Sequence, residues 1–193
     1  MLLGYRKKPI IIVKYGSRHK ISFNNIHFFI MSKLKMRIKV DNRIPTRMNL
    51  LVRNVLPTDV PTCCALCERG DESSLHLFLH CEVAGRVWQG VLVWWEKILL
   101  IPPNLFILWE SWCGGERNKR TRNGLRVIWH TTIWVLWKAR NERVFNNHIT
   151  EVAEMVDEIT VLSWRWSLDR ILMSPCLYYE WCWNPKDCLL RRV

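Results

Sequence analysis

The chain has 193 residues, of which 49% are hydrophobic, so it can bury a real core as one domain or two small ones. Its net charge of +12 is confined to residues 1–53, which hold 13 Lys or Arg residues and one acidic residue, Asp41. No secretory signal peptide precedes the eight cysteines, and no apolar stretch approaches the ~20 residues of a membrane-spanning helix. We therefore expect a protein of a reducing, intracellular compartment without membrane segments.

The first clearly predicted element begins after residues 1–38, which form a basic segment. In this segment the apolar run 10–13 has strand character and the run 26–31 fits either a strand or a buried helix, but neither has a clear period. Pro45 and Thr46 predict the start of a helix, with Thr46 as its N-cap, and Leu56 and Pro57 predict its end. Its expected apolar positions are Leu50, Leu51 and Val55.

A cluster of potential soft-metal ligands follows in the segment 63–81. Cys64, Cys67, His76 and Cys81 have the spacing C-x2-C-x8-H-x4-C, which predicts a four-coordinate zinc site. Because all four positions would come from protein, no position stays open for water, and the zinc would be structural. Cys63 could replace Cys64, and His80 could replace His76. We favour Cys64 for its two-residue spacing, and His76 because it can converge with Cys81 over one helical turn.

Periodic apolar residues predict further helices, at 75–80, 84–99, 125–137 and 151–166, the last with Thr150 as its N-cap. The stripe of the second helix includes Val87, Trp88, Val91, Leu92, Trp95, Ile98 and Leu99, and that of the third includes Leu125, Ile128, Trp129, Thr132, Ile133, Leu136 and Trp137. Residues 114–124, rich in Gly, Arg, Lys and Asn, favour a boundary or mobile loop. The aromatic tail, 176–193, shows no regular period. The sequence thus predicts a mostly α fold with a small Cys/His zinc loop and little β structure.

Two compositional features have both a functional and an ordinary interpretation. The twelve tryptophans lie mostly in apolar periodic stretches and favour a bulky helical core over base stacking on exposed rings. The basic segment suits either non-specific contact with nucleic-acid phosphates or a solvated tail.

Three blocks of this sequence, taken in order, resemble the reverse-transcriptase zinc-binding domain of plant non-LTR (LINE-type) retrotransposons. The first runs from Arg43 through the ligand cluster to Trp88, the second spans residues 133–145, and the third spans residues 181–185. The resemblance covers about residues 39–193, and residues 1–38 lack the upstream pattern expected of the family. The resemblance implies a zinc-binding module at 39–113 and a tryptophan-rich helical region at 114–193, and we expect the unmatched residues 1–38 to form a basic segment that can be disordered.

The resemblance also bears on function. It implies one structural Zn²⁺ on Cys64, Cys67, His76 and Cys81, and association with RNA or DNA through Arg43, Arg47 and Arg53. The parent protein is a polymerase, but this chain lacks the Tyr-x-Asp-Asp tetrapeptide whose carboxylates bind catalytic metals, so we expect no enzyme activity and no catalytic residues. The alternatives are a structural fragment that binds the polymerase domain or itself, and a retroelement relic without function. A retroelement product would work in the nucleus.

Overall fold

The computed structural model describes residues 44–171 and 174–191. They belong to a compact unit that covers residues 39–193. The elements, in chain order, are α2 (Arg47–Val52), the π-helical turn η1 (His76–His80), α3 (Glu82–Trp94), α4 (Leu105–Cys113), α5 (Lys119–Asn146), α6 (Val152–Arg170), α7 (Tyr178–Trp183) and α8 (Pro185–Leu190). Within the described ranges there is no strand, only one isolated antiparallel bridge between Cys63 and Asp71. The mostly α fold with little β structure is confirmed.

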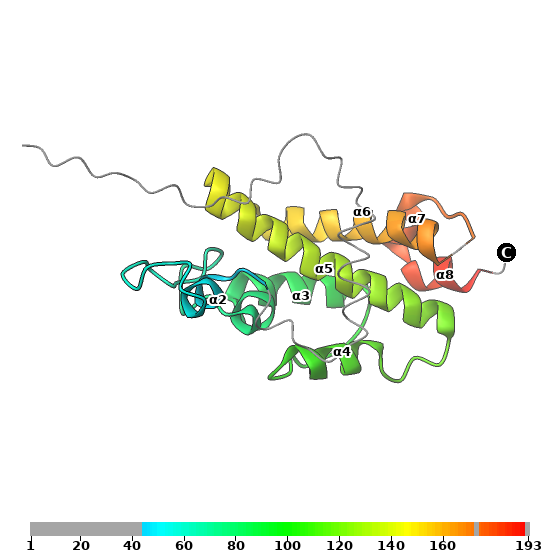
Figure 1. The fold of residues 1–193 in the computed structure, drawn as a ribbon. Coiled ribbons are helices and arrows are strands. Elements are labelled where there is room, and N and C mark those ends of the chain that lie inside the picture. Colours follow the sequence, from blue (N-terminus) through cyan, green and yellow to red (C-terminus); the bar gives the residue numbers. More distant parts are fainter. Residues whose placement is uncertain (1–43, 172–173, 192–193) are drawn as a thin grey trace, which may run out of the picture. The chain divides into compact units, whose positions relative to one another are not determined.

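The long helix α5 is the centre of this unit (Figure 1) and contacts η1, α3, α4, α6 and α8. The predicted stripe is buried at Leu125, Ile128 and Leu136, but Val127 and Val135, on other sides of the helix, are buried as well. A helix that is apolar on several sides belongs inside a core rather than on its surface. The other helices pack around it, and α3 and α6 also contact each other.

The tryptophans form much of this core, as the ordinary interpretation of the composition predicts. Trp88 and Trp112 are fully buried and meet edge to face, with ring centroids 5.6 Å apart. Their indole N–H groups donate to the carbonyls of Phe78 and Leu125, both at 2.8 Å. Buried indoles need such partners, and these bonds fix η1 and α5 against the helices that carry the rings.

Two predicted helices end earlier than expected. Helix α2 begins after the predicted cap, since Thr46 Oγ1 accepts the Asn49 amide at 3.4 Å, but it ends at Val52 and leaves Val55 exposed. Helix α3 ends at Trp94, where Glu96 adopts a left-handed conformation with φ 54°. Ile98, predicted to lie on the buried stripe, is therefore fully exposed. The prediction extended this helix too far because the apolar spacing continues to Ile98, although the backbone leaves the helical conformation at Glu96.

Three other predictions need correction. Helix α4 was not predicted, although Asn104 caps it by accepting the Ile107 amide at 2.9 Å. Helix α5 starts at Lys119 behind the Asn118 cap, so the predicted loop 114–124 is half helix. The tail forms α7 and α8 instead of irregular structure.

The start of the last long helix is displaced by one residue from the prediction. The N-cap of α6 is Glu151 rather than Thr150. The strand-like runs 10–13 and 26–31 lie outside the described residues. The division into a module at 39–113 and a region at 114–193 stays a prediction, and α4 of the first part packs on α5 of the second. None of the described helices combines the length and apolarity needed to cross a bilayer.

Candidate metal centre

The two cysteines of the first ligand pair lie in a tight turn closed by backbone hydrogen bonds. The Cys64 amide donates to the Gly70 carbonyl at 2.9 Å, and the Glu68 amide donates to the Cys64 carbonyl at 2.8 Å. The chain reverses because Glu68 and Gly70 have positive φ angles of 57° and 58°. Gly70 has no Cβ penalty there, so the turn can hold Cys64 and Cys67 on one side.

The second ligand pair, His76 and Cys81, lies at the two ends of one helical turn. The Ser73 hydroxyl accepts the His76 amide at 3.0 Å and starts η1, and the Cys81 amide donates to the His76 carbonyl at 2.7 Å. This i to i−5 bond is the π-helical step that brings residues 76 and 81 together. Cys81 is also the N-cap of α3, where free backbone N–H groups favour a thiolate.

The ligand atoms of Cys64, Cys67, His76 and Cys81 all lie within 4.8 Å of one another. The sulfur atoms of Cys64 and Cys81 are 3.9 Å apart, and Cys67 Sγ lies 3.2 Å from His76 Nε2. Tetrahedral zinc with bonds of about 2.3 Å to sulfur requires about 3.8 Å between two sulfurs and about 3.5 Å between sulfur and nitrogen. Three sulfurs and one imidazole nitrogen in this arrangement fit zinc in both chemistry and size.

The pKa shifts within the group differ in direction from residue to residue. The bond that the Cys64 thiol donates to Cys81, together with burial, raises the pKa of Cys64. The same bond lowers the pKa of Cys81. Burial, followed by the charge of His80, lowers the pKa of His76 and favours the neutral imidazole that binds metal. Metal binding to the three cysteines would release the protons of their thiols.

The two alternative ligands lie outside this group. Cys63 Sγ accepts a hydrogen bond from the Arg47 guanidinium at 3.4 Å, and the same Nη1 donates to the Cys63 carbonyl at 2.7 Å. His80, at the end of η1, is exposed. The geometry thus favours Cys64 and His76, and the assignment of individual ligands stays a prediction.

A fully buried carboxylate, which the sequence analysis did not single out as functional, anchors the loop to the core. Glu72 Oε1 accepts from Arg140 Nη2 at 2.7 Å and Nε at 3.1 Å, and from the Arg47 amide at 3.0 Å. Glu72 Oε2 accepts the Ala65 amide, inside the Cys64–Cys67 turn, at 3.0 Å. One side chain therefore ties the metal loop, α2 and α5 together. Glu72 and Arg140 both belong to the blocks of the resemblance, but no local pattern links residues 68 positions apart.

The three arginines predicted to contact nucleic acid are not equivalent. Arg53, the C-cap of α2, is exposed. Arg47 is half-buried, and its guanidinium is bonded to Cys63. Arg43 lies just outside the described residues.

Comparison with known families gives one match of this chain. Residues 15–88 match a family described as zinc-binding in reverse transcriptase. The match includes all four residues of the Cys/His group and ends in α3, and its first part, residues 15–43, lies outside the described residues. It begins upstream of residue 39, where the resemblance was placed, and it does not reach the blocks at 133–145 and 181–185. No curated protein and no solved structure matches the chain.

Proposed function

We propose that this chain is a zinc-stabilised, nucleic-acid-associated module derived from the reverse transcriptase of a plant non-LTR (LINE-type) retrotransposon. The observation that carries the proposal is the Cys/His group, which lies inside the segment that matches the reverse-transcriptase zinc family. Polymerase activity is not part of the proposal, because the sequence lacks the Tyr-x-Asp-Asp carboxylates. The role is binding.

The zinc would be a single structural ion. Cys64, Cys67, His76 and Cys81 would take all four tetrahedral positions and leave none for a reacting water. Its effect would be to hold the turn at 64–70 against η1, where few apolar side chains are available. Zinc binding in comparable small sites contributes on the order of 10 kcal/mol to folding.

The nucleic-acid partner is inferred from charge. Residues 1–53 carry all of the net charge of +12, and Arg53 presents an exposed cationic side chain at the end of α2. Cations on such a surface bind phosphates by releasing counterions, which gives affinity that falls with salt and depends little on sequence. Arg47 would contribute less than Arg53, because its guanidinium is already bonded to Cys63.

Fluorescence anisotropy with labelled RNA and DNA oligonucleotides, read over a salt series, tests this function. Zinc-loaded protein should bind with an affinity that falls steeply with salt, and Arg53→Gln should weaken all oligonucleotides alike. The matched control is Arg69→Gln, an exposed arginine that is paired with Glu82. Affinity that does not change with salt would contradict the proposal, as would the absence of binding.

A second candidate function rests on exposed apolar side chains from the end of α3 to the first turn of α4. Ile98, Leu100 and Phe106 are 100%, 88% and 53% exposed. Large apolar side chains exposed in one short segment are typical of surfaces that contact another protein. The candidate function is contact with a polymerase domain or with a second copy. Sedimentation velocity of the wild type and of Ile98→Ser/Leu100→Ser tests self-association, which the double substitution should abolish.

A further inference from the structure

Helix α7 presents two aromatic side chains to solvent. Trp183 is 90% exposed, whereas each of the other eleven tryptophans in the described residues is buried or half-buried. Tyr179, four residues earlier and so on the same side of the helix, is 68% exposed. Eleven tryptophan side chains thus contribute to packing, and Trp183 alone among those in the described residues is exposed to solvent.

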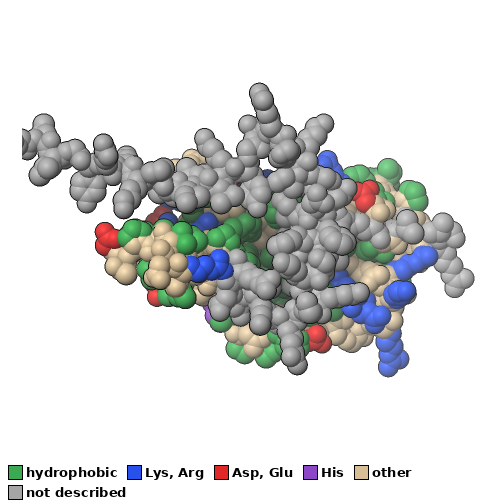
Figure 2. Space-filling view, in the orientation of Figure 1, with side chains coloured by type: hydrophobic (Ala, Val, Ile, Leu, Met, Phe, Trp, Pro, Cys, Tyr) green, Lys and Arg blue, Asp and Glu red, His purple; other side chains and the backbone are tan. Residues whose placement is uncertain are grey.

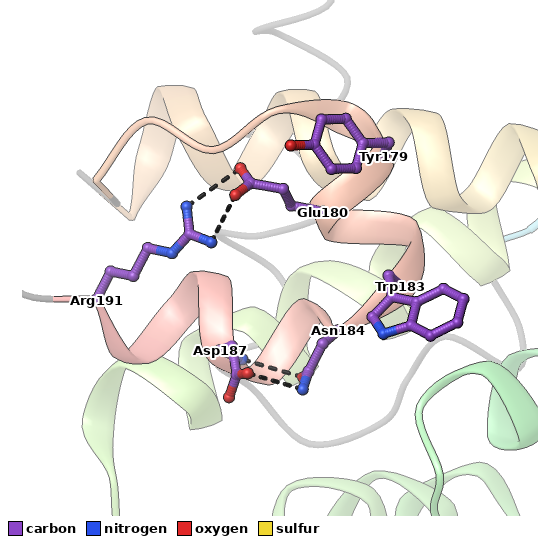
Figure 3. A pocket seen from close by; sticks show the side chains of 6 residues that line it. All are labelled: Tyr179, Glu180, Trp183, Asn184, Asp187 and Arg191. Atoms are coloured by element: carbon purple, nitrogen blue, oxygen red, sulfur yellow. Dashed lines mark hydrogen bonds and ion pairs between the residues drawn. The ribbon is translucent and has the colours of Figure 1, made fainter.

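The two rings border an open pocket of about 390 Å³, shown in Figure 3. Its lining residues are Tyr179, Glu180, Trp183, Asn184, Asp187 and Arg191. The Glu180 carboxylate accepts two hydrogen bonds from the Arg191 guanidinium, at 2.7 and 3.1 Å, so its charge is compensated. The Asn184 amide group donates to Asp187 at 2.9 Å. These pairs fix the shape of the pocket between the aromatic side and α8.

A basic surface adjoins this pocket. Arg120 Nη1 donates to the Arg191 carbonyl at 2.7 Å, which places the first turn of α5 beside the end of α8. No acidic residue occurs from 117 to 141, and the start of this stretch holds Arg117, Lys119, Arg120, Arg122 and Arg126. Arg117 and Lys119 are exposed. Figure 2 shows Lys and Arg side chains gathered at the end of the molecule where α5 begins and α8 lies.

The geometry points to a binding surface for single-stranded nucleic acid on α7, α8 and the start of α5. An unpaired base stacks on Trp183, with Tyr179 beside it, and the phosphates of neighbouring nucleotides contact the exposed Arg117 and Lys119. Exposed aromatic rings next to cations are the combination that holds single strands, because every base has a flat face. A duplex offers phosphates but keeps its bases stacked inside. This surface lies outside the segment that matches the zinc family, and the inference rests on the proposed association with nucleic acid.

The test uses the full zinc-loaded chain and fluorescein-labelled 12-nucleotide oligo-dT, oligo-U and a 12-base-pair duplex. Trp183→Ala should weaken binding of the single strands about tenfold, the loss of one stacked base, and leave the duplex unchanged. Trp183→Phe should retain most of the affinity. Phe145→Ala, which removes an exposed aromatic ring at the opposite end of α5, is the matched control and should change nothing.

Salt dependence separates the two kinds of contact. Lys119→Gln should reduce the slope of log affinity against log salt by about 0.7 for single strands, and Trp183→Ala should leave that slope unchanged. The dT and U arms distinguish DNA from RNA as the preferred strand.

Three results would overturn the inference, and they are distinguishable. If Arg53→Gln weakens binding but Trp183→Ala does not, the surface is wrong and the proposed function stands. If the wild type binds no oligonucleotide, both fail. If Trp183→Ala converts a dimer to a monomer without affecting oligonucleotide binding, the surface belongs to a second copy of the chain.

Discussion

The loop at 62–81 and the helix pair α5–α6 hold their shapes by different means. In the loop, two positive φ angles and a few backbone bonds bring three thiols and an imidazole together. In the helix pair, Leu136, Met155 and Ile159 are almost fully buried, and the packing itself sets the geometry. The loop is therefore expected to depend on metal, and the helices are not.

The two regions meet at the ion pair of Glu72 and Arg140, whose side chains are 0% and 5% exposed. Arg140 also stacks on Trp137, with its guanidinium 5.0 Å from the ring centroid. A helical region with its own core can thus orient the turn at 64–70, in which only Cys64 and Ala65 are buried. The metal would fix the conformation of the loop, whereas the ion pair fixes the position of the loop relative to the helices.

Metal removal should separate the two regions most strongly. A zinc chelator should abolish amide-hydrogen protection in the turn at 64–70, where metal binding contributes on the order of 10 kcal/mol, and leave most of the protection in α5 and α6. Hydrogen exchange followed by mass spectrometry measures both regions in one sample. Equal loss of protection in the loop and in α5 would contradict the comparison.

Disrupting the ion pair between Glu72 and Arg140 should have the next largest effect on stability. Arg140→Met leaves the Glu72 carboxylate buried without its cation, and we expect a loss of about 3–5 kcal/mol in the free energy of unfolding. Urea denaturation measures it. The control is Arg69→Met, which removes the exposed pair with Glu82 and should change stability by about 0–1 kcal/mol. Similar losses in the two variants would show that Glu72 does not anchor the loop.

The helical core should also give a pH dependence of its own. Burial, with a smaller effect from the nearby Arg126, lowers the pKa of His130 to about 4, below its unfolded value near 6.5. The unfolded state therefore gains a proton first, and stability is retained above pH 6.5 and lost as the pH falls towards 4. Between pH 7 and 5 the loss should be about 2 kcal/mol.

Because protons also compete for the metal ligands, the contribution of His130 is read as a difference between two proteins. His130→Gln should remove about 2 kcal/mol of the pH dependence of unfolding between pH 7 and 5 and leave the remainder. Identical pH profiles for the wild type and the variant would rule out His130 as the source.

The close contact of α5 with α8 predicts the smallest effect. A Cβ at Gly124 would overlap Leu189 Cδ1 and Cδ2, and Leu189 is fully buried, so its side chain must shift within the core. Gly124→Ala should destabilise the protein by about 1–2 kcal/mol, despite the better helix propensity of Ala. Gly85→Ala in α3, where a Cβ meets nothing within 4 Å, should stabilise it by up to about 1 kcal/mol. Thermal unfolding of the two variants compares them, and equal shifts would contradict the packing.

Local patterns predicted much of this structure. The C-x2-C turn and the histidine one helical turn before Cys81 indicated the four grouped residues, and the cap at Thr46 was found because a short side chain followed by a periodic stretch carries its own signal. The core position of the tryptophans also followed from helical spacing. These features depend on residues within a few positions of one another.

The features that were missed depend on long-range contacts or on backbone breaks. Ile98 continued an apolar period that Glu96 had already interrupted. The tail folds into α7 and α8 because Trp181 reaches Ser163 of α6, its indole N–H donating to the hydroxyl at 3.2 Å. The ion pair of Glu72 with Arg140 joins two blocks of the sequence. The sequence shows the order of these blocks along the chain but not the contact between them.

Native mass spectrometry of protein purified without added metal tests the central claim most directly. We predict a mass for the wild type that includes one zinc ion, retained in Cys63→Ser and His80→Ala and lost in Cys64→Ser/Cys67→Ser and in Cys81→Ser. The Cys63→Ser variant matters most, because Cys63 is the immediate neighbour of a proposed ligand but bonds to Arg47. A wild type without zinc, or zinc lost from Cys63→Ser and retained when Cys64 and Cys67 are replaced, would contradict the account.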